Sequence, residues 1–177
     1  TIQNAEYGIK MAANASPTIR DCYITLTNYP ALIYPDNDIN LINISLGTNG
    51  QPAILMNGGN IGYSSSSVTR RWNISGVLVH IQSNIDVKSS SSSALSTLII
   101  EGGAQFAFAD DAGLYVGSDN TNYRGALNAS DVTFTAQDTS AGWPGLLFYN
   151  YSDDASSVVN SCTVEYATHG VYCESAN

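Results

Sequence analysis

Short apolar segments separated by small polar residues recur along the whole chain. The segments are rich in Ile, Val, Leu and Phe, and Gly, Asn, Ser and Asp lie between them. Such runs, bounded by turn-forming residues, are typical of β-strands. The expected strands cover residues 39–44, 77–81, 85–87, 98–100, 105–109, 114–116, 132–135 and 146–149. No stretch has the i, i+3, i+4, i+7 apolar spacing of an amphipathic helix, so the pattern predicts an all-β protein with no capping helix.

An internal repeat distinguishes a solenoid from a β-sandwich. Residues 163–171 (Thr-Val-Glu-Tyr-Ala-Thr-His-Gly-Val) align without gaps on residues 1–9 (Thr-Ile-Gln-Asn-Ala-Glu-Tyr-Gly-Ile). Cys22 and Cys162 also occupy the same repeat position, and one coil would take about 22 residues. Stacked units of this kind bury a continuous core. The repeat therefore predicts a right-handed parallel β-helix (β-solenoid) of roughly eight coils, about 40 Å long at the 4.7–4.9 Å spacing of neighbouring strands.

Several phrases in the second half of the chain resemble a known family. Residues 98–108 (Leu-Ile-Ile-Glu-Gly-Gly-Ala-Gln-Phe-Ala-Phe) are similar to a phrase that introduces a coil in secreted β-helix repeat proteins of the pectate-lyase-like superfamily. Residues 143–148 resemble that family's Trp-x-Gly-apolar coil, and residues 165–167 resemble its Ile-Glu-Tyr-Ala signature. Gly102 stands where the family usually has Pro. The resemblance implies the fold and no single function, because this fold hosts lyases, hydrolases, adhesins and inert scaffolds.

The length of 177 residues fits one domain, a single β-helix over residues 1–177. Four consecutive serines and two adjacent arginines indicate a protruding loop over residues 60–76. Both ends of the sequence lie in mid-coil. Because uncovered coil edges favour further strand pairing, we expect either more coils or stacking on identical copies.

Charge excludes two classes of partner. The chain has 6 Lys and Arg against 15 Asp and Glu, a net charge of −9. It lacks the basic patch that nucleic acids or anionic membrane surfaces require. The apolar runs are strand-sized, so membrane insertion is not expected. Only 12% of residues are charged, whereas Asn, Ser and Gly make up about 30%. This composition favours an extracellular or cell-surface location.

The sequence offers little catalytic chemistry. Two pairs of adjacent carboxylates occur in turns, Asp110 with Asp111 and Asp153 with Asp154. They are interpreted as solvated turn residues, and the alternative is a weak Ca²⁺ site. No cofactor other than Ca²⁺ is considered possible. His80 is expected on the outer face of a strand and His169 at a corner, and neither has a partner at zinc-ligand spacing. No catalytic residue is assigned, and a non-catalytic role is favoured over an enzyme.

Other residues indicate contact with sugars or oxidising surroundings. Four aromatic residues are candidates for stacking on sugar rings, although strand propensity alone also explains tyrosines: Trp72, Trp143, Tyr149 and Tyr151. Five Asn-x-Ser sequons are candidate glycosylation sites: Asn14, Asn43, Asn73, Asn128 and Asn150. Cys22, Cys162 and Cys173 are interpreted as buried thiols, with a Cys162–Cys173 disulfide as the alternative in a secreted chain.

These observations favour a non-catalytic structural or adhesive β-solenoid outside the cell. It would be a filament or stalk subunit whose partners are identical copies stacked end to end. The alternative is a carbohydrate-binding or polysaccharide-degrading module, a lyase or a hydrolase, that acts on a surface polysaccharide.

Overall fold

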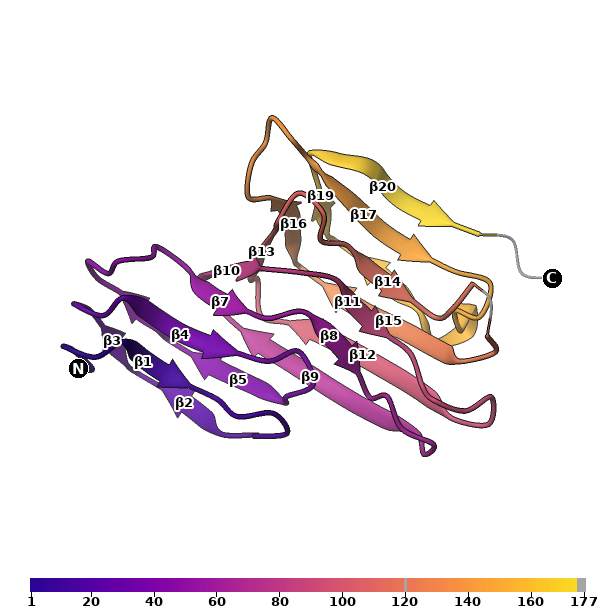
Figure 1. Ribbon diagram of the computed structural model, residues 1–177, viewed down its shortest axis with the longest axis horizontal. Helices are drawn as coiled ribbons and strands as arrows, with labels where there is room; N and C mark the ends of the chain where they lie inside the picture. The colour runs from indigo at the N-terminus through magenta and orange to yellow at the C-terminus, as the bar shows by residue number, and fades with distance from the viewer. Residues whose placement is uncertain (120, 175–177) are drawn as a thin grey trace.

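The chain folds into a parallel β-solenoid, seen in a computed structural model that describes residues 1–119 and 121–174 (Figure 1). All pairs of described strands are parallel, and each strand inside a sheet pairs with the strands one coil before and one coil after it. The seven-strand sheet has the order β1 (Tyr7–Lys10), β4 (Tyr29–Ile33), β7 (Ile54–Met56), β10 (Leu78–Ile81), β13 (Gln105–Phe108), β16 (Thr133–Ala136) and β19 (Thr163–Val164).

Two further large sheets complete the coils. The six-strand sheet has the order β18 (Val158–Asn160), β15 (Arg124–Ser130), β12 (Leu95–Glu101), β9 (Val68–Ile74), β5 (Ile39–Ile42) and β2 (Thr18–Arg20). The five-strand sheet has the order β20 (Ala167–Cys173), β17 (Trp143–Phe148), β14 (Leu114–Val116), β11 (Ile85–Val87) and β8 (Gly59–Ile61). A small sheet pairs β3 (Tyr23–Ile24) with β6 (Ser45–Leu46). The described residues contain one short 3₁₀ helix, η1 (Asp154–Ser156).

Only the first coils have the length that the internal repeat predicts. Tyr7 pairs with Tyr29 and Thr18 with Asn40, which is the expected spacing. Later coils are longer, as the pairing of Gln105 with Thr133 shows. The uniform coil length is therefore wrong beyond the first coils. With seven strands in the longest sheet, the expectation of roughly eight coils was also too high.

The coil changes its cross-section after β6. The first coils use the small β3–β6 sheet, which ends there, and the five-strand sheet begins with β8. The coil between these two arrangements is the longest, since the pairing of Ile39 with Trp72 spans more of the sequence than any other pairing of described strands. The protruding loop expected over residues 60–76 is limited to residues 62–67 and to the turn after Ile74, because β8 reaches Ile61 and β9 begins at Val68. β9 takes up residues 68–74, because its alternating apolar side chains Trp72 and Ile74 point into the core.

A recurring turn joins the six-strand sheet to the next strand of each coil. In five of the six turns one residue with positive φ lies within two residues of the strand end: Asp21, Asn43, Gly76, Asp131 and Ser161. After β12 two glycines, Gly102 and Gly103, have positive φ. Asp, Asn and Gly adopt this left-handed conformation at low cost. An inward-facing residue comes next, such as Ile44 or Val132, both buried. The turn therefore sets which face of the following strand enters the core.

Aromatic rings stack along the core from coil to coil. Phe106 lies between Trp72 and Phe134, with ring centroids 5.6 and 6.1 Å apart. Phe108 stacks on Trp143 at 4.3 Å and an interplanar angle of 12°. Offset stacking of this kind adds to the stabilisation from burial. Within the described residues, no helix is long and apolar enough to cross a membrane.

Candidate functional site

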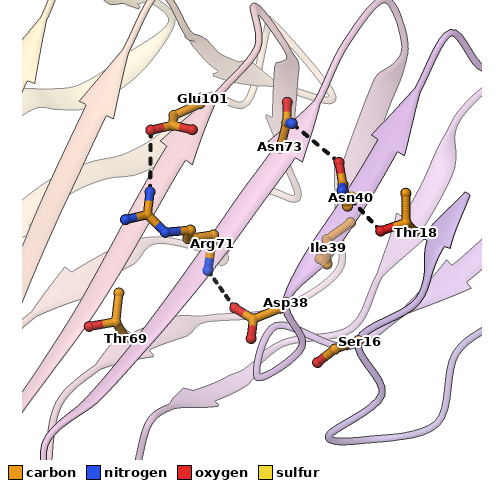
Figure 2. A pocket seen from close by; sticks show the side chains of 9 residues that line it. All are labelled: Ser16, Thr18, Asp38, Ile39, Asn40, Thr69, Arg71, Asn73 and Glu101. Carbon is orange, nitrogen blue, oxygen red and sulfur yellow. Dashed lines mark hydrogen bonds and ion pairs between the residues drawn. The ribbon is translucent and has the colours of Figure 1, made fainter. Parts of the chain in front are cut away.

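A polar groove of about 530 Å³ lies on the outer face of the six-strand sheet (Figure 2). Its lining comes from β2, β5, β9, β12 and the segments before β2 and β5: Ser16, Thr18, Asp38, Ile39, Asn40, Thr69, Arg71, Asn73 and Glu101. Most of these side chains face outward because alternate residues of the same strands, such as Leu41 and Trp72, are buried in the core.

A row of polar side chains crosses four coils in the groove. Thr18, Asn40, Asn73 and Glu101 occupy paired positions on neighbouring strands. The Asn40 Nδ2 donates to Thr18 Oγ1 at 3.1 Å, and the Asn73 Nδ2 donates to Asn40 Oδ1 at 3.2 Å (Figure 2). Each amide group has more donors and acceptors than these bonds use. The row can therefore also bind a ligand rich in hydroxyl groups.

Arg71 is the exposed cation of the groove. Its backbone N–H donates to the Asp38 carboxylate at 2.8 Å. Its guanidinium contacts Glu101 through Nη1 and Oε1 at 3.4 Å, and the two side chains are 59% and 51% exposed. Exposed ion pairs of this kind contribute little to stability. The guanidinium thus remains able to bind a hydroxyl or carboxylate group of a ligand.

The C-terminal end of the solenoid exposes a coil made of β18, β19 and β20. In the described part of the chain, each of these strands pairs with only one other strand. Val171 in β20 is 53% exposed and Val159 in β18 is 38% exposed, whereas their partners Leu146 and Ala129 are buried. A hollow of about 260 Å³ opens here, lined by Phe148, Val159 and Cys173 and by the polar residues Ser152, Asp154, Ser157 and Glu174. This end is therefore a mixed surface, with apolar side chains next to strand edges that no described strand pairs.

The last coil has the same turns as the first coils. Asn4, Leu26 and Tyr166 all have positive φ, between 53° and 57°, as do Asp21 and Ser161. The alignment of residues 1–9 on residues 163–171 places Asn4 on Tyr166. The internal repeat found in the sequence is therefore confirmed in backbone conformation.

The cysteines share part of this repeat. The Cys22 and Cys162 thiols each donate to the carbonyl two residues earlier at 3.3 Å, and both pack half-buried against the core. Cys173 is exposed, so its interpretation as a buried thiol is wrong. All three are free thiols, and the alternative Cys162–Cys173 disulfide is not formed in this structure.

The four aromatic candidates for sugar stacking do not form one face. Trp72 and Trp143 are 2% and 1% exposed, so both are core residues and cannot stack on a sugar. Tyr149 stacks on Tyr115 with centroids 5.8 Å apart, and burial raises the pKa of both hydroxyls. Tyr151 is exposed. Of the four candidates, only the two tyrosines therefore remain accessible to a sugar.

The paired carboxylates have separate surroundings. Asp110 and Asp111 border a shallow hollow with Asp138. Asp153 accepts hydrogen bonds from the Ser156 N–H and from Arg124, and Asp154 accepts one from Ser152. Among the residues described, no three His, Cys, Asp or Glu side chains are placed to hold a metal ion.

Sequons and histidines are distributed over several surfaces. Asn14 and Asn128 are exposed, as is Asn43, whereas Asn73 and Asn150 are half-buried. His80 lies on the outer face of β10 as expected, and partial burial lowers its pKa. His169 is exposed within β20 rather than at a corner.

Nothing in the sequence marked Asp38, Arg71 and Glu101 as parts of one site. The strands that carry the groove pair at three different sequence offsets, so no fixed spacing marks its residues.

Comparisons of the chain with protein-family models, with curated proteins and with solved structures gave no match.

Proposed function

We propose that this protein is a non-catalytic structural β-solenoid of the cell surface or extracellular space, and that its copies stack end to end into a filament or stalk. The observation that carries the proposal is the exposed coil of β18, β19 and β20. Among the described residues each of these strands is paired on one side only, and apolar side chains such as Val171 are exposed there. Strand edges of this kind add further strands.

Two further features support this role. The chain carries few charges and a net charge of −9, which suits a soluble and inert rod. The coil phrases at residues 98–108 and 143–148 resemble secreted β-helix repeat proteins. We accordingly also propose that the chain belongs to the pectate-lyase-like superfamily, lies outside the cell and has an adhesive role.

The test is the mass of the protein in solution as its concentration rises, together with negative-stain electron microscopy. We expect the mean mass to grow with concentration and thin filaments to form. Val171→Asp should prevent this growth, because a charge at an edge strand opposes pairing. Tyr63→Asp is the control, since Tyr63 is equally exposed but lies between β8 and β9, outside the first and last coils. Monodisperse single chains at every concentration would refute the proposal.

A second candidate function is carbohydrate binding without turnover, favoured by the groove on the six-strand sheet. Its row of amides and hydroxyls and the exposed Arg71 guanidinium suit a polyhydroxylated chain that bears occasional carboxylates. A glycan-binding screen of the wild type, followed by Arg71→Ala, tests it. We expect about a tenfold loss of affinity, with Arg124→Ala as the control outside the groove. A screen without any hit would contradict this candidate.

A further inference from the structure

We infer the register in which copies stack: β20 of one copy pairs in parallel with β1 of the next, with Gly8 of the second copy beside Gly170 of the first. This inference rests on the proposed end-to-end assembly and adds the strands and residues that meet. It follows from the internal repeat, from two equivalent glycines, and from the path of the chain.

The two glycines are equivalent in sequence but not in surroundings. A Cβ on Gly8 would lie 2.5 Å from Ile24 Cγ2 and 2.6 Å from the Pro30 carbonyl oxygen, because the next coil packs against β1. A Cβ on Gly170 would meet no described atom within 4 Å. Neither glycine has positive φ. Gly8 is therefore required by the coil that covers it. Gly170 is the extra residue where β20 shifts register against β17, and no described residue covers it, so its outer side has room for a covering strand.

The first coil of this same chain fits as that cover. Residues 1–4 precede β1 as residues 163–166 precede β20, with the same left-handed turn at Asn4 and Tyr166. Residues 1–4 already act as a strand toward β3, since the Thr25 N–H donates to the Ile2 carbonyl at 3.0 Å. Their other edge is unpaired among the described residues, as is that of β1.

The register stacks one β-branched side chain on another in the core. Ile9 of the second copy lies on Val171 and extends the core, and Lys10 lies on Tyr172 on the outer face. The chain path places residues 1–4 on β19 and β1 on β20, so β2 lies one coil further on. In this register none of the next copy's described strands lies beside β18, so Val159 is outside the contact that the described strands make.

This predicts different effects for two valines on the same exposed end. Val171→Asp should abolish assembly, whereas Val159→Asp should leave it within about twofold of the wild type. Gly170→Ala should lower the association constant about tenfold or more, since overpacking costs about 1–3 kcal/mol and about 1.4 kcal/mol is tenfold. Its melting temperature as a single chain should not change. Gly8→Ala, the matched variant, should lower the melting temperature. Equal loss of assembly in both valine variants would overturn the register.

Disulfide trapping tests the register directly. In a background with Cys22, Cys162 and Cys173 replaced by Ser, Lys10→Cys protein is mixed with Tyr172→Cys protein and treated with diamide. Diamide takes up the two electrons and two protons that the thiol pair releases. Neighbouring strands lie about 4.8 Å apart, within the Cα separation of about 4.4–6.8 Å that a disulfide allows. We expect a cross-linked mixed dimer on a non-reducing gel.

The control mixture pairs Lys10→Cys with Thr168→Cys. Thr168 is exposed on the same strand as Tyr172, but it lies nearer the start of β20 and is therefore too far from Lys10 in the proposed register. It should give at most about a tenth of the mixed dimer. Filaments without the Lys10–Tyr172 cross-link would overturn the register and leave the proposed function standing. Single chains without any cross-link would overturn both.

Discussion

At the residue scale, Trp72 shows how burial changes the role of a side chain. Its ring lies in the core, and its indole Nε1 donates to the Pro35 carbonyl at 3.1 Å. The sequence placed it on a loop because Arg70, Arg71 and the preceding serines are polar. Alternation along β9 instead points Arg71 outward and Trp72 inward. Local composition therefore predicted the wrong environment, and the strand period determined the correct one.

Replacing Trp72 with Phe tests this environment. The substitution leaves the buried Pro35 carbonyl without its donor and removes part of the ring, so the free energy of unfolding should fall by about 1–3 kcal/mol. Urea denaturation measures the change. Tyr151→Phe, on an exposed ring, is the control and should change it by less than about 0.5 kcal/mol. Equal effects would show that Trp72 is not a core residue.

Asp153 gives the protein a pH dependence at its C-terminal end. Hydrogen bonding to Ser156, and then the Arg124 guanidinium, hold the pKa of Asp153 below its ordinary value. A lowered folded pKa stabilises the fold above the unfolded pKa of about 3.9, and that contribution is lost as pH falls through the folded value. Asp153→Asn should therefore destabilise the protein at about pH 7 and much less at the lowest pH at which it stays folded. Thermal melts of both proteins across this range measure the difference. A gap between wild type and variant that stays constant with pH would contradict this account, and Asp154→Asn is the control.

At the scale of elements, Gly145 determines how the last two strands of the five-strand sheet pair. Its φ is +115°, and the pairing of β17 with β20 shifts register between Gly145 and Leu146. A Cβ here would overlap the His169 carbonyl group. Only glycine therefore permits β20 to approach β17 this closely.

Gly145→Ala should detach β20 and lower the free energy of unfolding by more than about 2 kcal/mol. Hydrogen exchange should lose protection in β20 before other strands. Gly76→Ala is the control, because it has positive φ but nothing within 4 Å of the added Cβ, so only backbone strain of about 1 kcal/mol should remain. Retained protection in β20 would show that the strand tolerates a side chain there.

Sequence patterns predicted the strands better than the coils. β11 and β14 have the predicted bounds, because both are apolar alternations bounded by Gly, Asn or Lys. The coil length was wrong, since residues added between strands leave each strand's own period unchanged. The groove was missed for the same reason: Asn40 and Asn73 become neighbours only across the longest coil. The repeated turns could be predicted where the chain kept the spacing of its first coils.

At the scale of the whole molecule, charge opposes the proposed stacking. Each copy carries a net charge of −9, so neighbouring copies repel one another at low ionic strength. Salt shortens the Debye length from about 30 Å at 0.01 M to about 8 Å at 0.15 M. Assembly followed by light scattering should therefore speed up over this range. Slower assembly at higher salt would mean that attraction between charges, rather than apolar contact, joins the ends.

The difference between the two ends of the solenoid has a consequence for the direction of such a rod. Every strand pair among the described residues is parallel, and the two ends carry different edges, β1 at one and β20 at the other. Copies joined β20 to β1 would all point the same way, so the fibre would have a direction and two chemically distinct tips. Growth by addition of copies could then occur at one tip while the other tip is anchored.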